Sequence, residues 1–172
     1  AVCPQLQDRV VTTNGVSKAY AMTGWRIGYA AGPQELITAM ITVQSQSTTN
    51  PCSVSQAAAV AALDGDQSCV SEMTAAYRQR HDFSVAALNE IPGCACRPGE
   101  GTFYAFPKVE GALENKGLDS DVQLAELLLN EGDIAVVPGT AFGAPGYIRL
   151  SFACSMDELE ESVRRIKRVI AA

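Results

Sequence analysis

The sequence has no apolar run of the roughly 18 residues that a membrane-spanning helix needs. It contains no basic segment followed by an apolar core, so we expect no secretory signal within it. Basic residues are the minority, since 13 Lys and Arg stand against 19 Asp and Glu, which gives a formal net charge of −6. Nucleic-acid binding depends on Lys and Arg contacts to phosphate, so this balance argues against nucleic acid as a partner.

The spacing of cysteine and histidine that marks a zinc site is also missing. The six cysteines form no CxxC pair, and His81 is the single histidine, so we expect no bound metal. Free cysteine behaves as a small buried hydrophobe, and we expect all six to be reduced and structural, which favours a cytoplasmic location. Cys94 and Cys96 lie two apart in a predicted strand, and we expect them on opposite faces of it. The other four are Cys3, Cys52, Cys69 and Cys154.

The length and composition of the chain are typical of a globular protein. The chain has 172 residues, 47% hydrophobic and 19% charged, which suits one domain or two small ones. In the first half, two strands and three helical segments are predicted. The strands span 9–13 and 26–31, a loop covers 14–24, and the helices start at Gly32-Pro33, at Ser53 (a capping-box pattern with Gln56) and at Cys69, the last running to Leu88.

The pattern changes at about Gly93, where a hairpin is predicted from strands 94–97 and 102–106. A polar loop at 107–117 precedes a helix at 121–131, which Ser120 caps, and strands at 134–137 and 147–152. The last helix, 156–170, has Ser155 and Glu158 as its capping box. One apolar stripe runs along it, made of Leu159, Val163, Ile166 and Ile170.

These elements predict an α/β fold class. The second half is an α/β unit of a few strands and two helices. The first half has only two strands, too few for an independent sheet with two faces to bury. We therefore expect exposed strand edges and an exposed apolar face in the first half.

The segment 14–28 carries the chemistry. It places Lys18 in a loop of small and apolar residues, with Arg26 eight positions later at the start of a strand. Desolvation in such surroundings lowers an ammonium pKa, and a neutral amine is what a Schiff-base nucleophile requires. The alternative is a surface lysine on a loop.

This segment closely resembles the cofactor-lysine signature of class I aminotransferases, in the bacterial aspartate aminotransferase branch. The matching string is SKAYAMTGWRIG at 17–28, preceded by NGV. Further segments of that branch recur in the same order and at comparable spacing, so the resemblance covers nearly the whole chain. They are Gly32-Pro33, 46–49 (QSTT), 101–104 (GTFY), 136–140 (VVPGT) and 147–151 (YIRLS).

The resemblance implies roles for three residues of this segment. Lys18 resembles the lysine that binds pyridoxal phosphate covalently and then moves a proton at the substrate Cα. Arg26 resembles the arginine that pairs with the cofactor phosphate, and the alternative is a surface arginine. Ser17 matches a position from which a hydroxyl can bind the same phosphate.

Arg149 lies in an otherwise apolar strand, and an unpaired buried charge is very costly, so it needs a partner. The resemblance implies that this arginine binds the substrate α-carboxylate with two parallel hydrogen bonds. The alternative is a structural ion pair with a glutamate of the final helix.

The resemblance also implies a domain plan: 1–91 as an incomplete carboxy-terminal part of the cofactor-binding large domain of a fold type I enzyme, and 92–172 as the small α/β domain. The groups that the family places earlier, including the Asp at the pyridine nitrogen, have no counterpart here. Three interpretations stay open: a fragment with little or no activity alone, one half of a split transaminase, or a non-enzymatic α/β interaction module. The implied substrates are an amino acid, aspartate first, and a 2-oxo acid, and the implied assembly is a homodimer.

Overall fold

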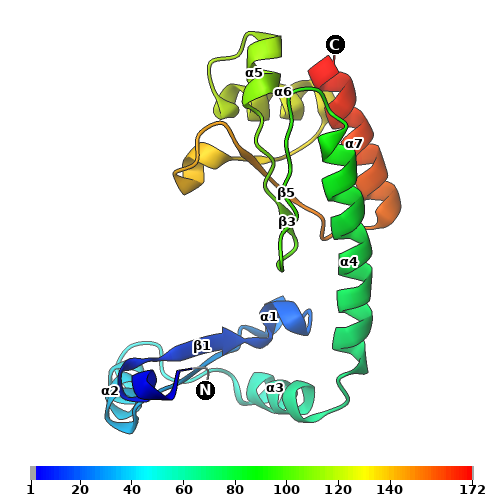
Figure 1. The fold of residues 1–172 in the computed structure, drawn as a ribbon. Helices are drawn as coiled ribbons and strands as arrows, with labels where there is room; N and C mark the ends of the chain where they lie inside the picture. Colours follow the sequence, from blue (N-terminus) through cyan, green and yellow to red (C-terminus); the bar gives the residue numbers. More distant parts are fainter. Residues whose placement is uncertain (1–2, 172) are drawn as a thin grey trace. The chain divides into compact units, whose positions relative to one another are not determined.

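The computed structural model describes residues 3–171. The chain divides into two compact units, Ala1–Glu72 and Met73–Ala172, which are described separately (Figure 1). The division falls within helix α4 (Ser68–Asn89), because the later part of α4 packs on the core of the second unit through residues such as Tyr77 and Leu88. The predicted assignment of 1–91 and 92–172 to the family's two domains stays a prediction.

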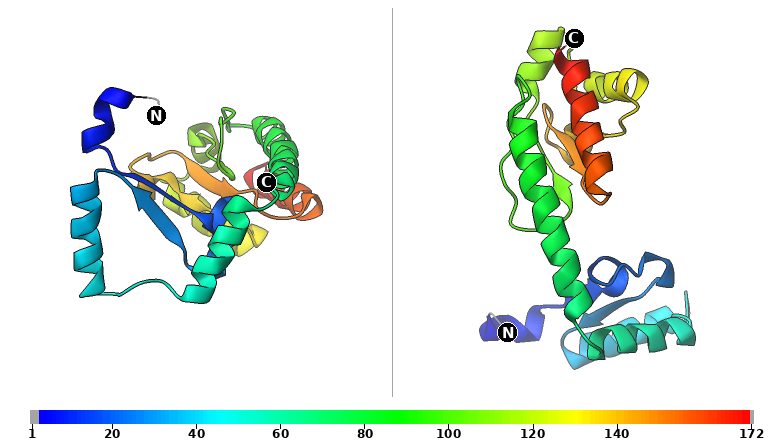
Figure 2. Two further views of the ribbon diagram at one scale, coloured as in Figure 1. Left: turned by 90° about the horizontal axis from the view of Figure 1, so that it is seen from below. Right: turned by 90° about the vertical axis from the view of Figure 1, so that its right-hand side faces the viewer.

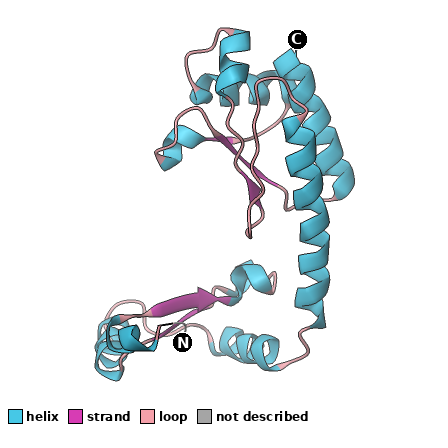
Figure 3. Ribbon diagram, in the orientation of Figure 1, coloured by secondary structure: helices cyan, strands magenta, loops and turns pink. Residues whose placement is uncertain are grey.

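The first unit contains two short strands, four helical segments before α3, and α3 itself (Figure 3). Strands β1 and β2 pair antiparallel, with Thr12 opposite Ala31 and Gly15 opposite Gly28. The predicted first strand begins too early, because Pro4 starts a 3-10 helix. The predicted loop 14–24 is wrong as well, since two helical turns form within it. The elements are η1 (Pro4–Arg9), β1 (Thr12–Gly15), α1 (Val16–Ala19), η2 (Thr23–Trp25), β2 (Gly28–Ala31), α2 (Gln34–Ser45) and α3 (Ser53–Asp64).

The core of the first unit is small. Val16, Ile27 and Ala59 are its buried hydrophobic residues, with Tyr20 and Met22 packed against them. Every residue of β2 is exposed, as predicted for a strand whose apolar face is uncovered. Apolar side chains also remain exposed along α2 and α3. They are Leu36, Met40, Ile41 and Val43 on α2, and Val54, Val60 and Leu63 on α3.

The second unit is built on a three-stranded antiparallel sheet in the order β3-β5-β4, with helices packed around a shared core (Figure 2). Tyr104 of β3 lies opposite Ser151 of β5, and Val137 of β4 lies opposite Arg149. The elements after α4 are β3 (Tyr104–Ala105), α5 (Glu110–Lys116), α6 (Asp121–Gly132), β4 (Val137–Pro138), η3 (Gly139–Phe142), β5 (Ile148–Ser151) and α7 (Met156–Ala171).

Two predictions for the second unit are wrong. The hairpin between 94–97 and 102–106 does not form, because β3 pairs with β5, and Ala95 instead bridges Lys108. The predicted polar loop 107–117 contains helix α5, whose Ala112 and Leu113 are buried. In both cases packing against distant segments decides the local structure.

The helix caps of the second unit are confirmed. At α7 the Ser155 backbone N–H donates to Glu158 Oε2 at 2.9 Å, and the Glu158 N–H donates to Ser155 Oγ at 3.2 Å. All four residues of the predicted α7 stripe are buried. The Gln123 N–H donates to Ser120 Oγ at 3.3 Å, so Ser120 caps α6. In α3, by contrast, Ser53 is the first helical residue and makes no cap, which corrects that prediction.

The cysteines are unpaired, but they are not uniformly buried. Cys3, Cys52 and Cys69 are exposed in the first unit, where the core is too small to cover them. Cys94 and Cys96 both contact the core of the second unit. The 94–97 segment forms only the isolated bridge from Ala95 to Lys108, so the placement of the two cysteines on opposite faces of a strand stays a prediction. Within residues 3–171, no helix has the length and apolar character needed to cross a membrane.

Candidate functional site

Lys18 lies on α1, directly after β1. Val16 fixes this turn, because its side chain is fully buried, and the pairing of Gly15 with Gly28 brings the two strands together beneath it. A Cβ atom on Gly15 would lie 3.0 Å from the Ile27 carbonyl oxygen, so this approach favours glycine. Lys18 itself is exposed. The small core of the first unit therefore does not cover this residue.

Arg26 connects η2 to β2 in a left-handed backbone conformation, with φ 55° and ψ 45°. Ala21 also has a positive φ of 53°. Neither residue is Gly or Asn, and such conformations cost on the order of 1 kcal/mol each and concentrate at functional sites. The Arg26 guanidinium donates to the Thr23 carbonyl oxygen at 2.9 Å, which ties the arginine to its own turn.

The structure thus places Ser17, Lys18 and Arg26 on one connection between two paired strands. The segment 16–27 contains two basic residues and no acidic one. Amine, guanidinium and hydroxyl groups together suit a ligand with an aldehyde and a phosphate, because the amine condenses with the first and the others bind the second. This donor set fits pyridoxal phosphate.

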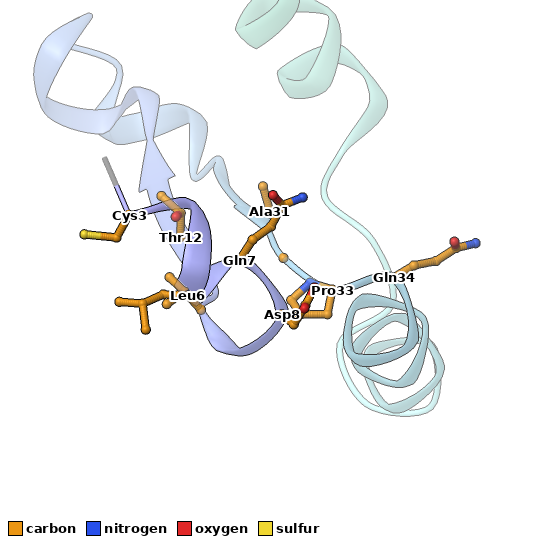
Figure 4. A pocket seen from close by; sticks show the side chains of 10 residues that line it. Cys3, Leu6, Gln7, Asp8, Thr12, Ala31, Pro33 and Gln34 are labelled. Atoms are coloured by element: carbon orange, nitrogen blue, oxygen red, sulfur yellow. The ribbon is translucent and has the colours of Figure 1, made fainter. Parts of the chain in front are cut away.

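The first unit also has a cavity of about 740 Å³ elsewhere, between η1 and the β2–α2 junction (Figure 4). Its lining is mostly apolar and includes Leu6, Val10 and Pro33, with Asp8 as its one charged residue. Lys18 and Arg26 are not among the residues that line it. The cavity therefore contributes nothing to the chemistry assigned to the lysine segment.

Arg149 lies on β5 of the second unit and is half-buried. Its Cζ atom lies 4.3 Å from the centroid of the Tyr104 ring and 4.5 Å from that of Phe142. Among the described residues, none of the three α7 glutamates forms an ion pair with Arg149: Glu161 binds Arg164 and Arg165, Glu158 caps the helix, and Glu160 makes no such contact. The partners of Arg149 in the described chain are aromatic rings.

Asp121, the first residue of α6, is a buried acid that the sequence did not single out. It is 1% exposed and accepts hydrogen bonds from the backbone N–H and the hydroxyl of Thr140, each at 2.7 Å. Burial alone raises the pKa of the Asp121 carboxyl, but the bonds from Thr140 outweigh it and hold that pKa below its usual range. This contact fixes the turn η3, which carries Phe142.

We expect Asp121→Asn to destabilise the second unit at neutral pH by roughly 2–3 kcal/mol, the scale of hydrogen bonds to a charged group. Because the folded-state pKa is lowered, the contribution of Asp121 is present above its unfolded pKa of about 3.9 and disappears as pH falls through the folded value. Urea unfolding of both proteins from pH 7 to pH 2 should show their difference shrinking with acid. A difference that is constant across this range would contradict the assignment.

His81 has a structural arrangement. It is buried, the Gly99 N–H donates to Nε2 at 3.0 Å, and Nδ1 lies 2.8 Å from an oxygen of Asp82. Since Nε2 accepts, Nδ1 carries the proton and donates to Asp82. The single histidine therefore joins α4 to the 97–101 loop.

Comparison with known proteins identifies the group to which this chain is similar. Residues 2–166 match the family Aminotransferase class I and II. The aspartate/prephenate aminotransferase of Nitrosomonas europaea is 51% identical over 98% of this chain and 44% of its own length. An aspartate aminotransferase of Rhizobium meliloti is 50% identical over 95% of the chain and 41% of its own length. The chain thus spans less than half the length of these curated relatives.

Solved structures agree with this result. The aspartate aminotransferase from Rhizobium meliloti matches with a TM-score of 0.92 and 47% identity, over 98% of this chain and 43% of its own. The aromatic aminotransferase from Pyrococcus horikoshii matches with a TM-score of 0.89 and 37% identity, over 98% of this chain and 44% of its own. The resemblance inferred from the lysine segment is therefore confirmed, as is the α/β class as part of a fold type I enzyme. The chain belongs to the class I and II aminotransferase family.

Proposed function

We propose that this chain carries the cofactor lysine, a phosphate-binding arginine and a carboxylate-binding arginine of a pyridoxal-phosphate-dependent aminotransferase. The observation that carries the proposal is the acid-free connection between paired strands that holds both Lys18 and Arg26. The proposed substrates are an amino acid and a 2-oxo acid. Aspartate is the first candidate and prephenate or aromatic substrates come next, because relatives bear these names.

Each residue has a distinct task in this proposal. Pyridoxal phosphate, when bound, supplies an aldehyde and an electron sink. Lys18 Nζ would hold the cofactor through its aldehyde group, and its free amine would move the proton at the substrate Cα. Arg26 and Ser17 bind the phosphate, Arg26 through its planar set of donors. Arg149 binds the substrate α-carboxylate and so orients the Cα–H bond.

The groups that the family places earlier in the chain, including the Asp at the pyridine nitrogen, have no counterpart in these 172 residues. We therefore propose that the chain is the carboxy-terminal portion of the enzyme, weakly active or inactive by itself. In this account the complete enzyme is a cytoplasmic homodimer. The unpaired cysteines support the cytoplasmic location.

A second candidate is a non-enzymatic interaction module or one half of a split enzyme. The exposed apolar residues of α2 and α3 favour either, because a second protein surface can cover them. Self-association of the chain, seen as a concentration-dependent sedimentation coefficient, is expected of the fragment as well, because the same exposed residues need to be covered. A well-behaved monomer at high micromolar concentration would count against this expectation.

The Arg26 assignment is tested by comparing pyridoxal phosphate with pyridoxal, which lacks the phosphate. We expect Arg26→Gln to weaken binding of pyridoxal phosphate about tenfold, the loss of one charge-assisted contact, and to leave pyridoxal binding unchanged. Visible absorbance titration measures both. Arg9→Gln is the matched control, since Arg9 is an exposed arginine of η1 in the same unit. Equal losses for the two ligands would refute the phosphate role.

A further inference from the structure

The second unit presents an aromatic surface on the face of its sheet that is turned away from the core. Side chains alternate along a strand, and Ala105 and Leu150, which lie opposite each other, both contact the core. Tyr104 and Arg149 therefore share the other face. Phe142, supplied by η3, reaches the same guanidinium. We call Tyr104 and Phe142 the aromatic seat of Arg149.

Both rings of the aromatic seat are held in place independently of Arg149. Tyr104 is fixed by β3–β5 pairing and contacts Phe103 at a ring distance of 4.4 Å. Phe142 ends the turn η3, which Asp121 holds through Thr140, and its ring meets Phe106 edge-on at 6.2 Å and 78°. The seat is thus set by the fold before any ligand arrives.

An arginine that contacts aromatic rings differs from one that is paired with a carboxylate. Arg164 and Arg165 donate to the Glu161 carboxylate at 2.7 Å, and those donors are occupied. The Arg149 guanidinium makes no hydrogen bond or ion pair within the described residues, and its contacts run from the guanidinium carbon to ring faces. Cation–π contact stabilises the charge without using the N–H groups, so they stay available to a carboxylate.

We propose that Tyr104 and Phe142 are positioning residues that pre-orient Arg149 for a carboxylate. The inference rests on the proposed function, in which Arg149 binds the substrate α-carboxylate. A long flexible arginine loses rotamer entropy on binding, and an arginine already held by two rings loses less. Removing either ring frees the side chain and weakens carboxylate binding while the N–H donors remain.

The test is an NMR titration of the full chain with sodium propionate, following the Arg149 Nε–Hε signal, which is assigned by its loss in Arg149→Lys. In the wild type we expect ring currents to displace this signal upfield and propionate to shift it. Phe142→Leu and Tyr104→Leu should each abolish part of the upfield displacement and weaken propionate binding about fivefold. Tyr104→Phe, which keeps the ring, should retain both.

Tyr147→Leu is the matched control, because Tyr147 stacks on Phe106 at 5.2 Å on the same surface and has no ring contact with Arg149. Unchanged propionate affinity in both leucine variants, despite loss of the upfield displacement, would overturn the positioning role and leave the proposed function intact. Arg149→Lys lacks the Nε–Hε signal, so its propionate binding is followed by the backbone amide signals of β5. Binding of wild-type affinity in this variant would instead refute the carboxylate role itself. Phe142 is 49% exposed, so Phe142→Leu should fold even if Tyr104→Leu does not.

Discussion

Gly93→Ala is expected to unfold the second unit, with a loss of more than about 4 kcal/mol. Gly93 has a φ of 82°, and a Cβ atom there would lie 2.3 Å from both the Ala112 nitrogen and the Gly111 carbonyl carbon. These are backbone atoms of α5, which no side-chain rotation can move. The helix would have to withdraw, breaking the 3.1 Å hydrogen bond from the Ala112 N–H to the Gly93 carbonyl oxygen and exposing Leu113.

Alanine substitutions at two other glycines distinguish the effect of the steric clash from the effect of backbone strain. Gly117 has a φ of 64°, but a Cβ atom there would meet nothing within 4 Å, so Gly117→Ala adds strain alone, about 1 kcal/mol. Gly101 has neither a positive φ nor a neighbour within 4 Å, and Gly101→Ala should be close to neutral. Urea unfolding monitored by circular dichroism ranks the three alanine variants by their free energies of unfolding. If Gly93→Ala is no less stable than Gly117→Ala, the close packing of α5 on Gly93 is wrong.

The sequence predicts those parts of the fold that local chemistry determines. The caps at Ser120 and Ser155 form because donor and acceptor lie three residues apart, and the α7 stripe follows from helical periodicity. The pairing of β3 with β5 joins segments more than 40 residues apart, and no local pattern distinguishes it from the predicted hairpin. Helix α5 is not predicted, because its polar residues are typical of a loop. Ala112 is buried by contact with the distant Gly93, which no local pattern indicates.

In the candidate site, too, some features follow from the local sequence and others from long-range packing. A contiguous motif identifies Lys18 and Arg26, but the left-handed backbone of Arg26 has no signal in the sequence, since neither it nor its neighbours predict a positive φ. The exposure of Lys18 depends on how much core lies around α1. The ring contacts of Arg149 involve residues from β3 and η3, and Asp121 meets Thr140 across 19 positions. Long-range packing decides these features.

The measurement that tests the central claim most directly is reductive trapping. The chain is mixed with pyridoxal phosphate and reduced with borohydride, and the modified lysine is located by peptide mass spectrometry. The chain has four lysines, and the three besides Lys18 provide internal controls: Lys108 is paired with Glu110, Lys167 is paired with Glu90, and Lys116 ends α5. We predict stoichiometric labelling confined to Lys18 and none in Lys18→Ala. Slight labelling, or labelling spread over Lys108, Lys116 and Lys167 as well, would contradict a cofactor role for this segment.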